Sequence, residues 1–472
     1  MRPEVLILGA GFSRSISPAM PLTDELGDLC LDIDDLRSDR RVPPGGFRGG
    51  SFELWLSRLA DEQPYLNAQE NLENQALFLR FSSAIAEVLN RCVQDVLRDG
   101  WPGWFPMFLR AAHHHRAVLI TFNYDPLVEC GVATGLLHDW GDSEPVSWTE
   151  TIGDVPTWAP GDMRWGAERA DTFRLLKLHG SLNWYWTPSD ITGVSIARRV
   201  LPGIFGAPNP YDEDDRRREL PGRVPFVVPP SATKSPYYRN PVVREIWQQA
   251  ATALRTASRV TIVGYSLPAG DLTFSAMLTE SLADDAVIEV VDPDAPSVLA
   301  RLLALGIDGD RLSMRNTASP IAGLVDDWTC NSAQALVRSL RESSETMQDP
   351  MIVAWNKDVG CVVTRWQSVG DAIELSVETN SSPWTAMRTR DHGDSPATLP
   401  PLSEPLAAAG PDARLVVRLP DGSKQVVCDH AIERSDGGYG RGVWNVLMPS
   451  GAPPTGLGRD TPAARVSIVD PR

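Results

Sequence analysis

Short apolar runs that end at a polar residue or a glycine recur along the first two-thirds of the chain. Runs of this kind predict strands that are covered on both faces, because they carry no polar alternation. The predicted strands are Val5–Leu8, Ala117–Thr121, Arg174–Leu178, Val260–Val263 and Val287–Val291. Segments with helical periodicity lie between them. The alternation of strands and helices predicts an α/β fold with a Rossmann-like parallel sheet, covered by helices on both faces.

Apolar residues at helical spacing predict the helices of this part. The longest such segment belongs to a helical insertion at about residues 23 to 115, and Thr23 is expected to cap the first helix of the insertion. The predicted helices are Asn67–Leu97, Trp101–Leu109, Leu127–Ala133, Tyr237–Ala257, one that starts at Asp271, Pro296–Leu305 and Asn331–Arg341.

Two stretches with little periodicity, residues 135 to 173 and 188 to 236, flank the apolar run that leads to His179. We expect them to be irregular and to form a lid or wall beside that histidine. The second stretch contains a run of mixed charge, residues 212 to 219, which is typical of solvated surface.

The pattern changes after about Ser344, where short strand-like runs alternate with turn residues. The sequence therefore predicts one domain over residues 1–344 and a small β-rich domain over 345–472. The strands predicted for the second domain are Met351–Trp355, Gly360–Thr364, Ala372–Val377, Ala413–Leu419, Gln425–Cys428 and Val443–Met448.

Composition excludes several classes of protein. A net charge of −17 over 472 residues argues against direct nucleic-acid binding, which depends on clustered Lys and Arg. The six cysteines lie far apart without a Cys-x-x-Cys pair, so neither a zinc knuckle nor a disulfide framework is expected. No apolar run is long enough for a signal sequence or a membrane span, which favours a cytoplasmic location without membrane contact.

The candidate chemistry lies where the predicted strands end. Carboxyl ends of parallel strands meet at one edge of a sheet, and ligands of open α/β sheets bind in the crevice there. A glycine-rich turn lets the backbone approach a pyrophosphate, and histidine accepts a proton readily near neutral pH. The breaks, in chain order, are Gly9–Ser13, Asn123–Asp125, His179–Ser181, Gly264–Ser266 and Asp292.

Some of these residues also have a purely structural interpretation. The third glycine of the usual dinucleotide fingerprint is missing after Gly11, so that match is partial. His179 could simply pack and hydrogen-bond at a strand end. Asp125 could cap the helix that follows Pro126. Asn123 has no such obvious duty, and its amide could orient a ribose hydroxyl or a water.

Taken together, the strand-end motifs resemble the sirtuin fold, in particular the prokaryotic SIR2-like branch associated with antiphage defence. The residues that carry the resemblance are Thr121–Asp125 (TFNYD), Lys177–Ser181 (KLHGS) and Gly264–Pro268 (GYSLP). It covers roughly the first two-thirds of the chain.

The resemblance implies roles for the individual residues, with NAD as substrate. His179 would be the catalytic base, and Asn123 and Asp125 would hold the nicotinamide ribose and the attacking nucleophile. The remaining cofactor-binding residues would be Gly9, Ala10, Gly11 and Ser13 at the phosphates, Gly264 and Ser266 at the phosphate and ribose side, and Asp292 at the adenosine ribose.

Two departures from protein-deacylating sirtuins make an acyl-lysine peptide a doubtful substrate. The chain lacks the four-cysteine zinc module, and Ala19–Glu25 stands where those enzymes have Gly-Ile-Pro-Asp-Phe-Arg. We therefore expect an NAD glycohydrolase that uses water as acceptor and no metal ion. Its transition state would resemble an oxocarbenium ion, as in glycoside hydrolysis. The alternatives are a deacylase or ADP-ribosyltransferase of the same fold, and a protein that binds NAD as a sensor or scaffold without turnover.

Control of such an enzyme is expected to involve the β-rich tail. An enzyme that destroys NAD must be inactive by default in its own cell, and the first two-thirds of the chain carry no evident sensor. Residues from about Met351 to Arg472 are therefore predicted to receive a signal, an activating ligand or a protein partner, the alternative being a passive stabilising domain. The resemblance also implies a homo-oligomer.

Overall fold

The computed structural model describes the first two-thirds of the chain in detail and, after residue 350, the backbone of strands alone. The described residues before that point are 4–48, 51–102, 104–133, 152–153, 157–158, 172–187, 196–199, 222–231, 234–315, 321 and 324. The mixed-charge run 212–219, the predicted helix Asn331–Arg341 and the predicted domain boundary at Ser344 lie outside them.

The chain divides into two compact units, each described here by itself. The first comprises Met1–Phe105, Ala112–Leu137 and Glu144–Ile321, and the second comprises Pro106–Ala111, His138–Ser143 and Ala322–Arg472.

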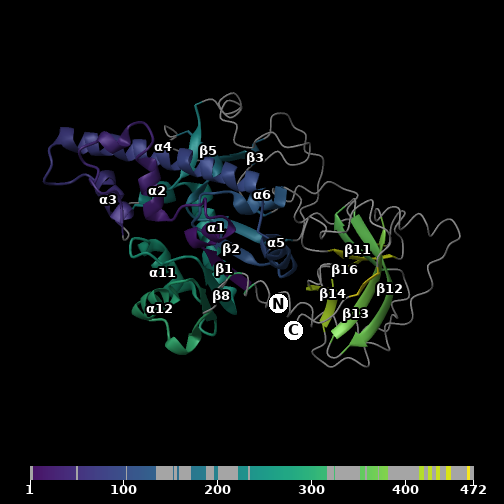
Figure 1. Cartoon of the computed structure of the whole chain (residues 1–472). Coiled ribbons are helices and arrows are strands. Elements are labelled where there is room, and N and C mark those ends of the chain that lie inside the picture. The colour runs from purple at the N-terminus through teal and green to yellow at the C-terminus, as the bar shows by residue number, and fades with distance from the viewer. Residues whose placement is uncertain are drawn as a thin grey trace. The chain divides into compact units, whose positions relative to one another are not determined.

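A six-stranded sheet in which every neighbouring pair is parallel forms the centre of the first unit (Figure 1). This confirms the predicted α/β fold. The strand order is β10-β9-β8-β1-β2-β4. The strands are β1 (Glu4–Leu8), β2 (Val118–Thr121), β4 (Arg174–Lys177), β8 (Arg259–Val263), β9 (Val287–Val291) and β10 (Leu312–Met314). Only β10 was not predicted, since its three residues are too few to give a pattern.

The central strand β1 shows why these runs are apolar throughout. Val5, Leu6 and Ile7 are all fully buried, so both faces of the strand are covered. In register, Ile7 lies opposite Ile120 of β2 and Ile262 of β8. Burial on both faces leaves no position for a polar side chain, which is what the sequence pattern indicated.

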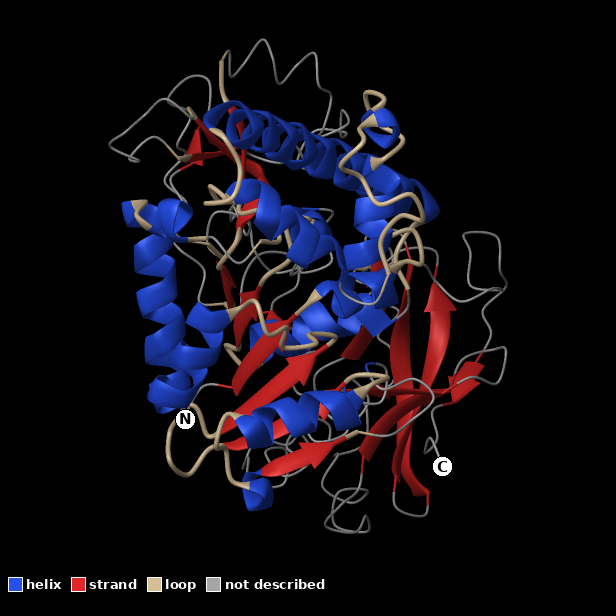
Figure 2. Ribbon diagram, turned by 90° about the vertical axis from the view of Figure 1, so that its left-hand side faces the viewer, coloured by secondary structure: helices blue, strands red, loops and turns tan. Residues whose placement is uncertain are grey.

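Helices pack around this sheet (Figure 2). The α-helices are α1 (Ala10–Ile16), α2 (Thr23–Cys30), α3 (Ser51–Ala60), α4 (Ala68–Asp99), α5 (Trp104–His114), α6 (Leu127–Ala133), α9 (Ser235–Tyr238), α10 (Pro241–Thr256), α11 (Leu272–Ser281) and α12 (Ala295–Ala304). The described residues also form two short 3-10 helices, η1 (Leu36–Ser38) and η2 (Gly309–Arg311).

The helical insertion centres on α4, which confirms the helix predicted from its periodicity. Asn67 caps α4 reciprocally: its Oδ1 accepts the Glu70 N–H at 3.0 Å, and a carboxylate oxygen of Glu70 accepts the Asn67 N–H at 2.9 Å. The ring of Phe81 on α4 packs against the rings of Phe47 and Phe52. No helix among the described residues, α4 included, has the length and apolarity needed to cross a membrane.

Three predicted helix boundaries were wrong, each for a local reason. Leu22, not Thr23, is the N-cap of α2, and its N–H donates to the Glu25 carboxylate at 3.1 Å. α5 begins only at Trp104, after Pro102, whose carbonyl accepts the Phe105 N–H. The helix predicted over Tyr237–Ala257 is interrupted between α9 and α10, because Asn240 caps α10 by accepting the N–H groups of its first turn.

A second, four-stranded sheet lies within the first unit and was not predicted. Its strand order is β3-β6-β5-β7, with β3 (Thr157–Trp158), β6 (Ala197–Arg199), β5 (Gly180–Trp186) and β7 (Val224–Val227). The expectation that residues 135 to 173 and 188 to 236 are irregular is therefore wrong where β3, β6 and β7 lie. β5 starts directly after His179 at Gly180, which has a φ of +81°. A Cβ there would lie 2.1 Å from the Phe226 carbonyl oxygen, so only glycine fits this turn.

The second unit contains an eight-stranded sheet, in agreement with the predicted β-rich tail. Its order is β15-β14-β13-β12-β11-β17-β16, and β18 pairs with β13. The strands are β11 (Met351–Asn356), β12 (Val359–Val369), β13 (Ala372–Asn380), β14 (Arg414–Arg418), β15 (Lys424–Val427), β16 (Ile432–Ser435), β17 (Val443–Leu447) and β18 (Arg465–Ser467). Each of the six strands predicted there is present, and β16 and β18 are additional.

Candidate functional site

The strand order brings the predicted site residues to one edge of the six-stranded sheet. At the carboxyl ends of β9, β8, β1, β2 and β4 stand, in this spatial order, Asp292, Gly264, Gly9, Asn123 and His179. From β1 the chain continues to β2 and β4 on one side, and it later returns to β8 on the other side. The sheet therefore reverses its winding between β1 and β8, where open α/β sheets bind their ligands.

The ends of β1 and β8 approach each other closely through glycines. A Cβ on Gly9 would lie 2.5 Å from the Gly264 carbonyl oxygen, and Gly264 has a φ of +59°. The Gly9 N–H donates to the Val263 carbonyl at 3.0 Å, and the Gly11 N–H donates to the Gly264 carbonyl at 2.8 Å. Two backbone N–H groups of the turn predicted to bind the phosphates, those of Gly9 and Gly11, thus have partners within the protein. Close packing of the strand ends is a structural reason for these glycines, and their phosphate-binding role stays a prediction.

Ser13, Asn123 and Asp125 form a hydrogen-bonded cluster beside Gly9. The Ser13 hydroxyl donates to Asp125 Oδ2 at 2.7 Å, and Asn123 Nδ2 donates to Ser13 Oγ at 2.9 Å and to the Gly9 carbonyl at 2.8 Å. A carbonyl oxygen can only accept, so the amide nitrogen of Asn123 must face Gly9. Asn123 Oδ1 makes no hydrogen bond within the described residues and is left as an acceptor.

Asp125 combines its predicted structural role with a place in this cluster. Its Oδ1 accepts the Leu127 N–H at 3.2 Å, which confirms the interpretation of Asp125 as a cap of α6. Burial raises the pKa of the Asp125 carboxyl, against the opposing effects of the Lys177 charge and the Ser13 hydrogen bond. Lys177 also donates to the Asp125 carbonyl at 2.7 Å, and it pairs with Glu129 at 3.1 Å, with both side chains of the pair almost fully buried.

His179 lies inside the protein, with only 4% of its surface exposed. Its Nε2 is 3.1 Å from the Tyr238 hydroxyl and 3.7 Å from Asp271 Oδ1, and the Phe122 ring contacts the imidazole edge-on at 5.0 Å between centroids. Burial lowers the pKa of His179 to about 3 although Asp271 acts to raise it, so the imidazole is neutral near pH 7. Nδ1 makes no hydrogen bond within the described residues. His179 is therefore a neutral imidazole with one ring nitrogen that makes no hydrogen bond within the described residues.

A buried polar cluster around His179 was missed by the sequence prediction. Asp271 accepts the Tyr265 hydroxyl at 2.7 Å on Oδ2 and forms an ion pair with Lys234 through Oδ1. Lys234 Nζ is also 3.8 Å from Glu53 Oε1 of the helical insertion. The sequence placed Asp271 only at a helix start. Nothing in the pattern around Lys234 or Glu53 indicates the contact, because it joins segments far apart in the chain.

Ser266 and Asp292 lie at the β8 and β9 ends and make contacts of their own. The Ser266 side chain is exposed, and its carbonyl accepts from the Arg301 guanidinium. Asp292 Oδ1 accepts the Asp294 N–H at 2.7 Å, and burial raises the pKa of Asp292. Within the described residues, no hydrogen bond joins either residue to the cluster of Ser13, Asn123 and Asp125. Their roles toward the adenosine ribose stay predictions.

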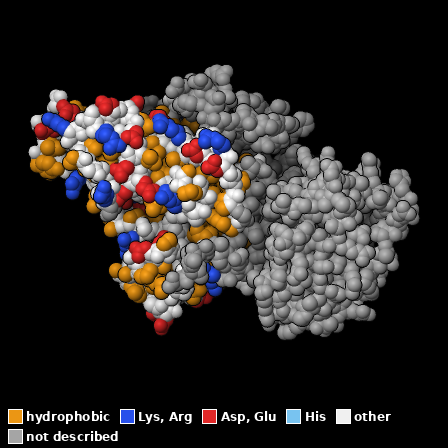
Figure 3. Space-filling view, viewed as in Figure 1, with side chains coloured by type: hydrophobic (Ala, Val, Ile, Leu, Met, Phe, Trp, Pro, Cys, Tyr) orange, Lys and Arg blue, Asp and Glu red, His pale blue; other side chains and the backbone are white. Residues whose placement is uncertain are grey.

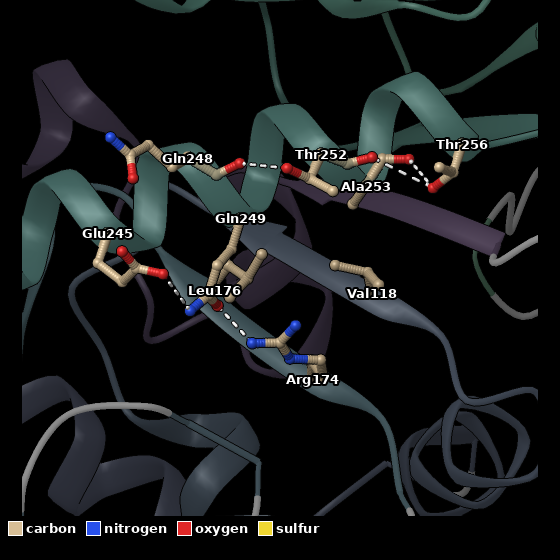
Figure 4. Close-up of a pocket in the computed structure, with 9 residues that line it drawn as sticks. All are labelled: Val118, Arg174, Leu176, Glu245, Gln248, Gln249, Thr252, Ala253 and Thr256. Carbon is tan, nitrogen blue, oxygen red and sulfur yellow. Dashed lines mark hydrogen bonds between the residues drawn. The ribbon is translucent and has the colours of Figure 1, made fainter.

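A cavity of about 390 Å³ between α10 and the sheet is a separate feature (Figure 4). It is lined by Val118 and Arg174, the first residues of β2 and β4, and by Gln248, Gln249 and Thr252 of α10. These strand positions are at the amino ends, whereas the cluster lies at the carboxyl ends. The cavity also lacks the convergent titratable groups that surround His179. We therefore place the candidate site at the carboxyl edge.

Charged side chains of both signs share the described surface. On the face that Figure 3 shows, Lys and Arg side chains are interspersed with Asp and Glu.

Among the residues that the structure describes, no group of three or more His, Cys, Asp or Glu side chains is arranged to hold a metal ion.

Comparisons with known proteins give a distant similarity of fold. No family model matches the chain, and no curated protein matches it. Among solved structures, a complex of a SIR2 homologue with NAD is 15% identical, with a TM-score of 0.33, over 69% of this chain and 88% of that one. A structure on the mechanism and regulation of Sir2 enzymes is 15% identical, with a TM-score of 0.30, over 69% and 92%. A complex of Sir2 with a p53 peptide and NAD+ is 13% identical, with a TM-score of 0.29, over 69% and 91%. Because identities and TM-scores are this low, we draw nothing about the chemistry of the site from them.

Proposed function

We propose that this chain is an NAD+ glycohydrolase, which cleaves the bond between nicotinamide and ribose and releases nicotinamide and ADP-ribose. One observation carries the proposal most. Asn123 Oδ1 and His179 Nδ1 make no hydrogen bond within the described residues, and they belong to the ends of two neighbouring parallel strands, β2 and β4. The motifs that contain them are those that resemble the SIR2-like branch.

The cleavage would need little more than these groups. Nicotinamide leaves as a neutral molecule with the electrons of the bond, and the ribose passes through an oxocarbenium-like state. Water then adds to the ribose carbon and gives up a proton, which neutral His179 accepts. Asn123, fixed by Gly9 and Ser13, would hold the ribose hydroxyl or the water through Oδ1. Neither step calls for a metal ion.

The remaining predicted residues would hold the rest of the substrate. The segment Gly9–Ser13 begins α1 at the switch point between β1 and β8, which suits the NAD phosphates. Gly264 and Ser266 would support the phosphate and ribose side, and Asp292 the adenosine ribose. We propose these roles from the motif resemblance and from the positions at the strand ends.

An experiment on the acceptor separates the proposal from its rivals. Purified full-length protein is incubated with NAD+, with and without an acetyl-lysine peptide, and the products are separated by chromatography and mass spectrometry. A glycohydrolase gives ADP-ribose at the same rate in both samples and leaves the peptide acetylated. A deacylase or ADP-ribosyltransferase needs the peptide or modifies protein, and a sensor or scaffold returns NAD+ unchanged after days.

The buried histidine predicts an unusual pH dependence of activity. Because burial lowers the pKa of His179 to about 3, the imidazole stays neutral where an exposed histidine gains its proton, near pH 6.5. We expect kcat/KM for NAD+ to show no inflection between about pH 5.5 and 7.5. A pH–rate profile that falls with an apparent pKa of 6 to 7 would contradict a neutral buried base.

The same pKa shift predicts how stability depends on pH. The unfolded chain binds a proton at the ordinary histidine pKa, whereas folded His179 does not. Its contribution to the free energy of unfolding is therefore complete above about pH 6.5 and is lost as the pH falls toward 3. Urea unfolding of the wild type and of His179→Gln across this range measures this contribution. The difference between their free energies of unfolding should shrink as the pH falls.

For the biological role, we propose that the enzyme is an effector of antiphage defence that depletes NAD+ when it is activated. Its β-rich tail would receive the activating ligand or protein partner, and the active form would be a homo-oligomer. Truncation at Gln348, with NAD+ cleavage measured with and without candidate partners, tests the tail. A truncated protein that cleaves NAD+ without any partner, or that never cleaves it, supports a regulatory role of the tail. A truncated protein that responds to the partners as the full-length protein does contradicts that role.

A further inference from the structure

Asp271 stands at the start of a helix but does not use its side chain to cap it. It is the N-cap residue of α11, where an aspartate normally accepts an N–H of the first turn. Its side chain makes no such bond. The carboxylate instead accepts the Tyr265 hydroxyl, pairs with Lys234 and lies 3.7 Å from His179 Nε2. The Asp271 side chain thus makes no hydrogen bond to the first turn of α11 and contacts the histidine and its neighbours instead.

Both oxygens of the Asp271 carboxylate have partners beside the imidazole, Tyr265 on Oδ2 and Lys234 on Oδ1. Tyr265, which donates to Oδ2, stacks on Phe122 at 4.3 Å between ring centroids, and Phe122 in turn contacts His179 edge-on. Asp271 and Lys234 are each 6% exposed, so solvent screens their charges little. The arrangement fixes one carboxylate oxygen on the Nε2 side of the ring.

We propose that Asp271 is a positioning residue for His179, which keeps the imidazole proton on Nε2 and leaves Nδ1 free to accept a proton. The inference deepens the proposed function and rests on it. When water loses its proton to Nδ1, His179 becomes positively charged, and the nearby carboxylate stabilises that charge. The proton on Nε2 stays in place throughout. Nε2 is 3.1 Å from the Tyr238 oxygen, within hydrogen-bond distance, and 3.7 Å from the Asp271 oxygen, which acts on the proton through its charge.

The other charged and titratable groups near the imidazole fit this role. Burial acts to raise the pKa of Asp271, but the charge of Lys234 and the hydrogen bonds from Lys234 and Tyr265 act to lower the pKa and favour the ionised carboxylate. Lys234 opposes protonation of His179, and Glu53 lies 3.8 Å from the Lys234 ammonium. Burial raises the pKa of Tyr238 and Tyr265 above the ordinary tyrosine value, so both keep their protons. Asp271 is the carboxylate that faces Nε2.

The opposing interpretation is that Asp271 and Lys234 form a structural ion pair that has no bearing on the tautomer of His179. The two interpretations differ in a quantity that can be measured without turnover. A carboxylate beside Nε2 favours the tautomer with hydrogen on Nε2, whereas an asparagine can present either an oxygen or an N–H group to that nitrogen.

The test uses Asp271→Asn in the full-length protein, labelled with ¹⁵N-histidine. The His179 signals are identified by their loss in His179→Gln. We expect the wild type at pH 7 to show hydrogen on Nε2 and a bare Nδ1, and Asp271→Asn to lose this preference. We also expect kcat for NAD+ cleavage to fall about 10- to 100-fold with KM little changed, which is less than the roughly 10⁴-fold loss where an aspartate contacts the histidine directly.

Asp308→Asn is the matched control, because Asp308 is an exposed N-cap residue whose Oδ1 accepts the Asp310 N–H. It should leave the His179 signals and kcat unchanged.

If Asp271→Asn keeps the wild-type tautomer, or changes it without loss of kcat, the proposal is overturned. Should Asp271→Asn fail to fold, Tyr265→Phe, which releases Oδ2, replaces it and must shift the signals in the same direction. A wild type without NAD+ cleavage would remove the proposed function, and the tautomer result would still decide the effect of Asp271 on His179.

Discussion

Replacing His179 with alanine is expected to lower kcat for NAD+ cleavage by about 100- to 10,000-fold, the usual loss when a general base is removed. The expectation follows from the position of the imidazole. It is neutral, almost fully buried and two residues beyond the end of β4, and one ring nitrogen has no partner among the described residues. Steady-state kinetics of nicotinamide release at saturating NAD+ give the comparison.

The control for this variant is another histidine of the first unit. His113 bonds to the Thr172 hydroxyl at 2.8 Å and lies on α5, outside the carboxyl edge. His113→Ala should keep wild-type kcat. Near-ultraviolet circular dichroism shows whether the His179→Ala core is intact. Cleavage by a folded His179→Ala protein at the parent rate would show that His179 is not the base.

Replacing Lys177 with methionine is expected to lower the free energy of unfolding by about 3–5 kcal/mol, the effect of removing one partner from a buried ion pair. Lys177 and Glu129 have side chains that are 2% and 4% exposed, and Lys177 also donates to the Asp125 carbonyl. The variant leaves the Glu129 charge in the interior without its counter-charge. Urea unfolding at pH 7 measures the loss.

Two further variants show whether burial is the cause. Arg91 and Glu87 form an exposed pair one turn apart on α4, so Arg91→Met should cost at most about 0.5 kcal/mol. The double variant Lys177→Met with Glu129→Met removes both charges and should recover most of the stability. A Lys177→Met protein as stable as Arg91→Met would contradict the account of the buried pair.

The edge of the sheet could be predicted because its information is local. Each strand is a run of apolar residues, and the predicted site residues follow the end of the run, as at Asn123 and His179. The fold class then follows, since alternating strands and helices place all carboxyl ends together. Asp125 was correctly assigned as a cap from Pro126 and the following helix.

The surroundings of His179 could not be predicted because they depend on contacts between distant segments. Lys234 comes from a stretch without periodicity, and Glu53 comes from the helical insertion, where the pattern indicates only packing. Asp271 was recognisable as a helix start, but its side chain turns away from the helix toward His179. A polar residue at a cap position gives no sign of this in the sequence.

The glycines show how a motif can be interpreted too narrowly. The turn after β1 was assigned to phosphate binding, yet Gly9 is also required by the approach of Gly264. The sheet formed by β3, β6, β5 and β7 was missed because β5 begins directly after His179, at Gly180, where the pattern suggested the end of a strand. Positive φ at Gly180 turns the chain directly into the next strand.

The central claim is that the carboxyl edge cleaves NAD+ with water as the acceptor, and one time course tests it most directly. Purified full-length wild type and Asn123→Ala are incubated with NAD+ alone, and NAD+, nicotinamide and ADP-ribose are quantified together. The account predicts that the wild type forms one nicotinamide and one ADP-ribose for each NAD+ consumed. It also predicts that the rate of NAD+ cleavage by Asn123→Ala is lower than that of the wild type by about 100-fold or more, because the variant lacks the amide that hydrogen-bonds to Gly9 and Ser13. NAD+ recovered unchanged from the wild type, or equal rates in the two proteins, would contradict it.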